Sequence, residues 1–199
     1  MKGPLSRLMT CKKMMETEQL RAQLEMHHAS SFGWAMACCG RDRSEAEEVL
    51  QIAYWKVLEG KARFEGAASF KTWLFAVIRK TAADHRRSNL LRRLLTLRAA
   101  ERDATAPGVE QPDESVYRAE LQRVFERALA GLPRRQCEAL QLVFYHDLSL
   151  KEAADVMGVS LGSARTHYER GKKRLRKILE GEPLYENRWR GKENPAIVQ

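Results

Sequence analysis

Hydrophobic positions recur at helical spacing in several segments of this chain, which predicts an all-α protein. Between Glu45 and Leu58 one helical stripe contains Ala46, Val49, Leu50, Ala53, Val57 and Leu58. Between Ser69 and Arg87 a second stripe contains Phe70, Trp73, Leu74, Val77, Ile78 and Thr81. No alternating pattern typical of a strand holds over more than a few residues. Each of the two helices is therefore expected to bury one face and to expose a charged face.

A second helical block follows a polar connection. The apolar positions of its first helix are Leu121, Val124, Phe125, Ala128 and Leu129. Pro133 suits the first position of the next helix, predicted at Arg134–His146. Between the blocks, the stretch DATAPGVEQPDES has the composition of an extended or disordered linker. The predicted organisation is an N-terminal extension of uncertain role (1–19), a helical domain (20–88), a linker (89–117), a second helical domain (118–180) and a polar tail (181–199).

The most informative stretch is 149–179, which predicts two short helices joined by a tight turn. Ser149 and Glu152 form an S-x-x-E capping box, Gly158 suits a left-handed C-cap, and Ser160 can cap the second helix. The buried face of that second helix is expected to contain Leu161, Ala164, Tyr168, Gly171 and Leu175. Its other face is polar and basic. This is the pattern of a helix-turn-helix, whose second helix lies in the major groove of DNA.

The charge of the chain favours a polyanionic partner. Its formal net charge is +9 and its pI is about 9.6. Seven Lys or Arg residues and one acid lie between Arg165 and Lys177, and eight Lys or Arg residues lie between Arg79 and Arg102 with two acids. Such basic clusters suit DNA, RNA or an anionic membrane surface. The first cluster adjoins the helix-turn-helix pattern, which favours DNA over a merely solvated helix face.

Several other classes of protein are not indicated. No apolar run has the length needed to cross a bilayer, and the N-terminus lacks the apolar core of a secretory signal. No catalytic triad or phosphate-binding loop is present, so we expect no enzyme activity and no cofactor. His27-His28 with Cys38-Cys39 is a possible metal or redox sensor, but adjacent cysteines do not easily bind one tetrahedral zinc. We therefore expect no metal site and a reduced, cytoplasmic location.

Four segments, in this order, resemble the extracytoplasmic-function (ECF) sigma factors of bacterial RNA polymerase, a group of the sigma-70 family. RSEAEEVLQIAYWKVLE is similar to the family pattern A-E-D-x-x-Q-x-x-F, and RFEGAASFKTWLFAVIRKTAADHRR to F-x-G-x-x-x-F-x-x-W-L-x-x-I-x-x-N with a basic end. ALAGLPRRQCEALQLVFYHDLSLKEAADVMGVS and GSARTHYERGKKRL resemble the family's second domain. Each motif alone is weak, but the four in register are specific.

The resemblance implies a fold and a function. The fold would be a sigma region 2 helical bundle and a sigma region 4 helix-turn-helix, joined by a flexible linker. Such a protein binds core RNA polymerase, directs it to promoter DNA and helps to melt the duplex. The resemblance also implies an inhibitory anti-sigma factor as a partner, and no membrane insertion.

The resemblance further implies three sets of site residues. The polymerase-binding set is Glu47, Glu48, Val49 and Gln51. The set that would bind and melt the downstream promoter element is Phe64, Phe70, Trp73, Lys80, Arg86 and Arg87. The set that would contact the upstream element as duplex is Ser163, Arg165, Thr166, His167, Arg170 and Lys173. Lys80 and His167 replace the family's usual asparagine and arginine, so no promoter sequence is carried over.

Two other functions and some plainer roles stay open from the residues alone. The chain would be an ordinary helix-turn-helix regulator if its first block were a sensor or dimerisation domain that needs no polymerase. It would be a DNA-modifying enzyme if the first block held a nucleophile with acidic or basic partners, and none converges there. Phe70 and Trp73 suit core packing as well as DNA contact. Trp55 is either a surface aromatic or an anchor for a partner protein.

Overall fold

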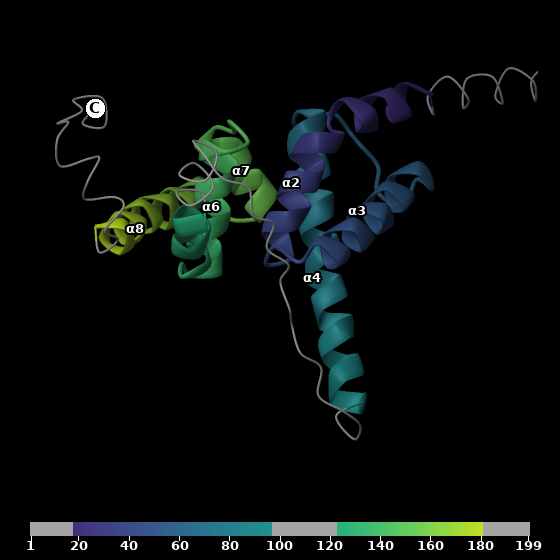
Figure 1. The fold of residues 1–199 in the computed structure, drawn as a ribbon. Helices are drawn as coiled ribbons and strands as arrows, with labels where there is room; N and C mark the ends of the chain where they lie inside the picture. The colour runs from purple at the N-terminus through teal and green to yellow at the C-terminus, as the bar shows by residue number, and fades with distance from the viewer. Residues whose placement is uncertain (1–17, 97–122, 181–199) are drawn as a thin grey trace, which may run out of the picture.

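All regular secondary structure in the described part of the chain is α-helical. A computed structural model describes residues 18–96 and 123–180, and within these ranges it contains no strand (Figure 1). The helices in chain order are 18–26, α2 (His28–Cys38), α3 (Arg43–Leu58), α4 (Phe70–Thr96), 123–130, α6 (Arg134–Phe144), α7 (Leu150–Met157) and α8 (Leu161–Leu179). The prediction of an all-α fold is confirmed.

The first helical bundle is built from α2, α3 and α4. Asp42 caps α3 by accepting a hydrogen bond of 2.9 Å from the backbone N–H of Glu45. The predicted stripe of α3 is buried from Ala46 to Val57, whereas Leu58, at the last turn, is exposed. On α4 the predicted positions Leu74, Ile78 and Thr81 are buried, and so is Phe75, which the predicted stripe did not include. The helical period of the sequence therefore located the core face of both helices.

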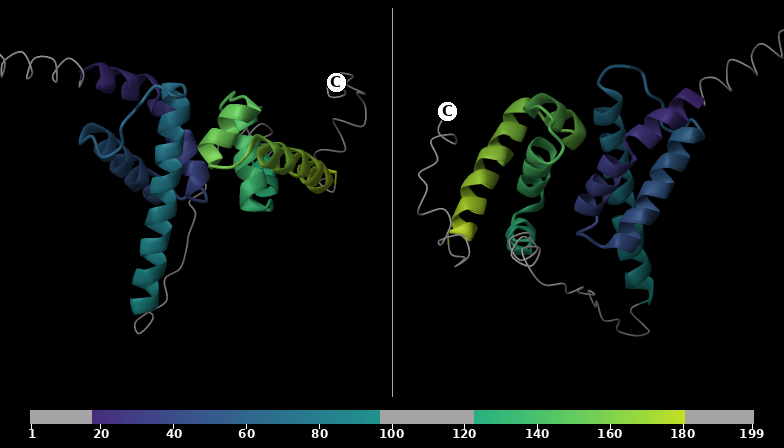
Figure 2. Two further views of the ribbon diagram at one scale, coloured as in Figure 1. Left: turned by 180° about the vertical axis from the view of Figure 1, so that it is seen from behind. Right: turned by 45° about the horizontal axis from the view of Figure 1, so that its top comes forward.

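Helix α4 extends beyond the predicted domain boundary, into a leucine-rich stretch that the sequence also allows to be helical. It continues through Ser88, where the first domain was predicted to end, as far as Thr96. The continuation is rich in leucine and arginine, which are good helix formers. Its C-terminal part projects beyond the other helices (Figures 1 and 2), and Leu90 and Leu91 are exposed. The predicted boundary at 88/89 therefore lies inside a continuous helix.

The helix-turn-helix forms as predicted. Ser149 and Glu152 make both hydrogen bonds of the capping box, and Gly158 ends α7 with a φ of 63°. Ser160 caps α8 by accepting from the backbone N–H of Ser163. The expected buried face is confirmed at Ala164, Gly171 and Leu175, and Tyr168 is half-buried. The prediction that Leu161 is buried was wrong. Leu161 is 45% exposed, because it is the first residue of α8 and follows the turn directly.

Gly158 is expected to be needed for the turn between α7 and α8. A Cβ at this position would meet no other atom, so Gly158→Ala tests backbone conformation alone. We expect a loss of about 1 kcal/mol in the free energy of unfolding, since a left-handed φ disfavours L side chains. Gly162→Ala is the matched control, because Gly162 is helical and its Cβ would also have room. Urea unfolding should show Gly162→Ala to be neutral or slightly stabilising; equal losses in both variants would contradict the argument.

The two helical domains pack against each other, which the sequence analysis did not anticipate. Helix α7 lies against α4, and α6 approaches α2 (Figures 1 and 2). Apolar residues of both domains belong to one continuous core, which includes Leu74, Phe75 and Ile78 from α4 with Ala153, Val156 and Met157 from α7. A second, smaller core lies between helix 123–130, α6 and α8. The second domain therefore has a core of its own and also shares one with the first.

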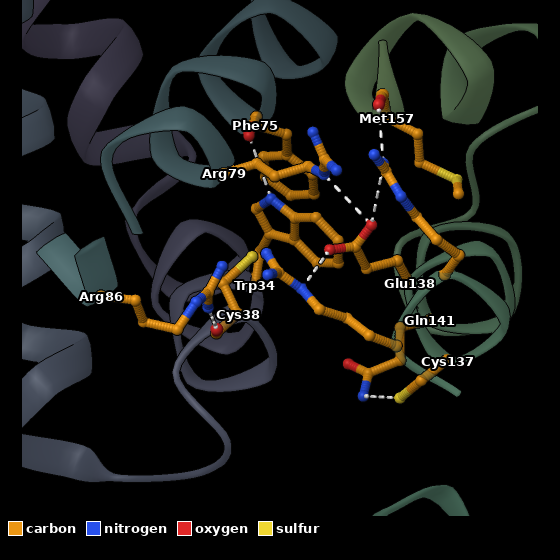
Figure 3. Close-up of polar contacts among 11 residues, drawn as sticks. Trp34, Cys38, Phe75, Arg79, Arg86, Cys137, Glu138, Gln141 and Met157 are labelled. Atoms are coloured by element: carbon orange, nitrogen blue, oxygen red, sulfur yellow. Dashed lines mark hydrogen bonds and ion pairs between the residues drawn. The ribbon is translucent and has the colours of Figure 1, made fainter. Parts of the chain in front are cut away.

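Three rings lie at the centre of the shared core. The indole N–H of Trp34 donates to the backbone carbonyl of Phe75 at 3.0 Å, and the two rings stack with centroids 5.8 Å apart (Figure 3). His146, from the second domain, meets both rings edge-on at 5.8 and 4.8 Å. Burial, and then the nearby Lys71, lower the pKa of His146 to about 4. His146 is thus a neutral, buried contact between the domains at neutral pH.

The depressed pKa of His146 predicts a loss of stability in acid. In the unfolded chain the imidazole takes up a proton near pH 6.5, whereas in the folded chain it does so only near pH 4. The unfolded state therefore binds more protons between these values, and stability falls as the pH falls from about 6.5 to 4. The contribution is at most roughly 3 kcal/mol.

Urea unfolding of the wild type and of His146→Leu across this pH range measures that contribution. The pKa of Glu152 is lowered chiefly by its hydrogen bonds with Ser149, so its contribution to the stability of the protein is also lost in acid. That loss occurs in both proteins. The difference between the two proteins isolates His146. Parallel pH profiles for the two would contradict the assignment.

Candidate nucleic-acid and protein interfaces

The outer face of α8 presents a row of polar and basic side chains. Its exposed members are Ser163, Arg165, Thr166, Arg170 and Lys173, and His167 is half-buried. The hydroxyl of Thr166 donates to the carbonyl of Gly162 at 2.9 Å, which fixes its rotamer. The face is continuous, because α8 is one unbroken helix from Leu161 to Leu179. All six residues predicted for the upstream element therefore lie on one helix, and five of them are accessible to DNA.

A basic groove continues this face along α8. It has a volume of about 710 Å³ and is lined by Gln136, Arg170, Lys173, Arg174, Lys177 and Ile178. Four positively charged side chains in one groove favour the binding of phosphate oxygens. The basic cluster is visible in the sequence, whereas the contribution of Gln136 on α6 to the opposite wall depends on tertiary packing.

Three predicted aromatic residues form one cluster beside the first turn of α4. The ring centroids of Phe64, Phe70 and Trp73 are 5.3–5.5 Å apart. Phe70 and Trp73 are half-buried against the core, whereas Phe64 is exposed. A pocket of about 180 Å³ opens at this cluster, between the loop that precedes α4 and the helix itself. Aromatic faces beside a small cavity suit the stacking of an unpaired base.

The basic residues predicted for the downstream element differ in their surroundings. Lys80 and Arg87 are exposed on α4, and Arg87 lies 3.7 Å from Asp84. Arg86 instead turns inward and donates to the carbonyl of Cys38, at the C-terminal end of α2. Burial, and then Arg134, lower the pKa of Arg86. The guanidinium of Arg86 is therefore engaged within the protein in this structure, and Lys80 and Arg87 remain accessible to a phosphate.

The residues predicted to bind polymerase lie on α3, but one of them is unavailable. Glu47 is exposed and pairs with Arg43 at 2.9 Å, and Glu48 is exposed and lies 3.1 Å from His85. Gln51 is also exposed. Val49 has no exposed surface, because it belongs to the core-facing stripe of α3. Its predicted contact role is corrected to one of packing beneath that surface.

A groove between α2 and α3 lies at this surface. It has a volume of about 250 Å³ and is lined by His28, Phe32, Arg43, Glu47, Leu50, Gln51 and Tyr54. An apolar floor with a charged rim is typical of a surface that binds a helix of another protein. Nearby on α3, Trp55 is 50% exposed, and the ammonium of Lys61 lies 3.4 Å from its ring centroid.

The cysteines do not form a reactive or metal-binding site in the described part of the chain. Cys38 and Cys39 are buried, free thiols. Burial raises the pKa of Cys39 to about 11 and that of Cys38 still further. A thiol with so high a pKa is a poor nucleophile and a poor ligand. No group of three potential metal ligands occurs among the described residues.

No helix among residues 18–96 and 123–180 combines the length and the apolar character needed to span a bilayer.

Comparison with known families gives a consistent result for both domains. The family model described as sigma-70 region 2 matches residues 24–91, and that described as sigma-70, region 4 matches residues 122–175. The ECF RNA polymerase sigma factor SigX of Bacillus subtilis is 32% identical over 142 residues, which cover 70% of this chain and 73% of SigX. The RNA polymerase sigma factor CarQ of Myxococcus xanthus is 29% identical over 152 residues, covering 76% of this chain and 84% of CarQ.

Solved structures support the fold. The sigma factor RpoE from Bartonella quintana, in complex with the anti-sigma factor NepR, matches 83% of this chain and 99% of its own, with a TM-score of 0.65 and 20% identity. CnrH, in complex with the cytosolic domain of CnrY, matches 88% of this chain and 97% of its own, with a TM-score of 0.59 and 20% identity.

Proposed function

Because this chain belongs to the sigma-70 family, in the extracytoplasmic-function group, we propose that it is an alternative sigma factor that binds core RNA polymerase, directs it to particular promoters and helps to melt them. The observation that carries the proposal is the presence on one chain of two surfaces of different kinds, each suited to DNA. The face of α8 suits duplex DNA, and the aromatic cluster suits unpaired bases. An ordinary regulator would need only the first.

Each surface has a proposed role. Ser163, Arg165, Thr166, His167, Arg170 and Lys173 contact the upstream element, where an arginine can bond guanine with two hydrogen bonds. Phe64, Phe70 and Trp73 stack on melted bases of the downstream element, with Lys80 and Arg87 beside the phosphates. Glu47, Glu48 and Gln51, at and beside the groove between α2 and α3, bind the polymerase. Nucleotide addition belongs to the polymerase, so this chain contributes no catalytic group.

Regulation and location follow from the same family. RpoE and CnrH were solved with an anti-sigma factor and with the cytosolic domain of CnrY, respectively. We propose that an anti-sigma factor also restrains this chain, and that it acts in the cytoplasm, where the polymerase and the promoter are.

Co-purification with bacterial core RNA polymerase, followed by run-off transcription from a library of promoter fragments, tests the proposed function. A sigma factor will bind core and will select a subset of promoters, whose shared sequences identify both elements. A chain that binds duplex DNA and ignores the polymerase would instead be a helix-turn-helix regulator. A chain that binds core but selects no promoter would contradict the roles given to α8 and the aromatic cluster.

A further inference from the structure

The aromatic pocket contains a carboxylate from its own loop. Glu65 lines this pocket together with the rings of Phe64 and Trp73. It belongs to the loop 59–69, which joins α3 to α4 (Figure 1). In that loop it stands directly after Phe64 and directly before Gly66, which has a φ of 76°. Residues next to it in the chain therefore place this carboxylate beside a stacking ring.

The oxygens of Glu65 are available to a ligand. Its side chain is exposed and makes no hydrogen bond or ion pair within the described part of the chain. Two other polar residues of the pocket are already engaged. Thr72 is buried and its hydroxyl donates to Glu152 at 3.3 Å, and the guanidinium of Arg63 donates to a backbone carbonyl of the loop at 3.4 Å. An ionised carboxylate has acceptors and no donor, so the free group of this pocket can only accept hydrogen bonds.

A carboxylate at this place has opposite effects on two parts of a DNA strand. It repels the phosphates on either side of a base in the pocket, which weakens binding of every sequence. It also accepts a hydrogen bond from any base that presents an N–H group at its edge, and this contact has a direction. The net effect of Glu65 therefore depends on the base.

Thymine differs from the other three bases of DNA in the groups along its edge. Cytosine, adenine and guanine each carry an exocyclic amine, whereas thymine carries the carbonyl oxygens O2 and O4 and a methyl group. An amine donates to a carboxylate, but a carbonyl oxygen faces it as a second acceptor with no proton between them. A carboxylate beside the stacking rings thus discriminates against thymine, through the contact that it gains with an amine and through repulsion of a carbonyl.

We propose that Glu65 selects the base that enters the aromatic pocket: its carboxylate accepts a hydrogen bond from an exocyclic amine, so that the pocket takes cytosine, adenine or guanine and rejects thymine at one position of the downstream element. This inference rests on the proposed function of the aromatic cluster and adds a base preference to it. Glu65 occupies the open position of the pattern F-x-G, so the preference belongs to this chain and is not carried over from the family. Phe64 and Trp73, in contrast, stack on any base.

A second carboxylate provides the matched control. Asp155 of α7 also lines the pocket and is exposed. It belongs to the helix-turn-helix domain, so its position beside the rings depends on tertiary packing, whereas Glu65 shares a loop with Phe64. Glu65→Gln and Asp155→Asn each remove one negative charge from the same pocket. Any difference between them therefore does not come from net charge.

The test uses the holoenzyme, formed from the full chain and core polymerase, on a pre-melted fragment of a promoter that it selects. Each melted position of the downstream element, on each strand in turn, is occupied by each of the four bases and by uracil. We expect one position at which thymine and uracil bind about tenfold more weakly than the three bases with an amine. Uracil lacks the methyl group of thymine, so its rejection assigns the effect to the carbonyl. Competition against a labelled fragment measures the relative affinities.

The two variants should differ at that position. Glu65→Gln retains the shape of the side chain and adds an amide N–H that can donate to O4 of thymine, so the discrimination should fall from about tenfold to within about twofold. Asp155→Asn should keep the discrimination of the wild type. Both variants should bind core polymerase as the wild type does, because neither residue lies on the surface of α3.

Three results would overturn the proposal. They are a downstream element with no position at which thymine and uracil are both disfavoured, a discrimination that persists in Glu65→Gln, and a discrimination that is lost in Asp155→Asn. The proposed function is judged at an earlier step, since a chain that fails to bind core or to select a promoter refutes the sigma-factor role before any base is compared. A holoenzyme that melts its promoters without this preference refutes only the role given to Glu65.

Discussion

Trp34→Ala is expected to destabilise the protein by about 3–5 kcal/mol, which is enough to unfold much of a typical small protein. Trp34 has no exposed surface, so the substitution leaves a large cavity in the shared core. It also removes the donor to the carbonyl of Phe75 and the ring that stacks on Phe75 and meets His146. The effect should therefore reach both domains and not only the bundle in which Trp34 lies.

Trp55→Ala is the matched control for this loss. Trp55 is also a tryptophan of the first bundle, but half of its surface is exposed and its ring contact is with the ammonium of Lys61. Its replacement should cost less than about 1 kcal/mol. Urea unfolding followed by circular dichroism compares the two variants, and similar midpoints for both would contradict the central position given to Trp34.

The sequence alone was sufficient for local features. The capping box at Ser149 and Glu152, the left-handed turn at Gly158 and the buried stripe of α3 depend on residues close together in the chain. Each was confirmed, except that Leu58 at the end of the stripe is exposed. Their physical causes, an unpaired helix terminus and a helical period, act over a few residues. For the same reason most of the exposed residues of the outer face of α8 could be predicted in advance.

The contact between the domains could not be predicted in this way. Trp34 and His146 meet across more than a hundred residues of sequence, and Arg79 and Glu138 across 59. Nothing in the neighbouring sequence shows that these residues are paired. Glu138 in particular is a charged residue on a helix, which a sequence pattern assigns to solvent. Only the packing of α6 and α7 against α2 and α4 reveals why it is buried.

The candidate sites show the same difference between features that follow from local sequence and features that depend on tertiary packing. Arg165 and Thr166 are accessible because their position on α8 follows from the helical period. The motif position of Val49 predicts contact with polymerase, although the period of its own helix puts it in the core. The motif position of Arg86 predicts contact with a phosphate, but its hydrogen bond to the end of α2 depends on tertiary packing that no local pattern encodes. A motif position therefore needs both its helical face and its tertiary neighbours before a role can be given to it.

The double variant Arg165→Ala with Arg170→Ala is expected to abolish recognition of the upstream element. Both residues are exposed on the outer face of α8, and neither guanidinium makes a hydrogen bond or ion pair within the described part of the chain. An arginine that bonds a guanine with two hydrogen bonds contributes about 1–3 kcal/mol of discrimination. The loss of both should therefore weaken binding to the selected element by roughly thirtyfold or more. Binding to core polymerase should not change, because the residues proposed to bind it lie on the first domain.

Sequence-specific recognition must be separated from simple loss of positive charge. Arg123→Ala with Arg127→Ala removes the same charge from helix 123–130 of the same domain, where both side chains are exposed. If α8 recognises bases, the control will weaken selected and unrelated duplexes equally and only slightly, whereas the α8 variant will lose the difference between them. Titrations of both duplexes at several salt concentrations make this comparison. Equal losses on both duplexes for the α8 variant would show that these arginines contact phosphates alone, and recognition of the element would then belong to other residues of the face.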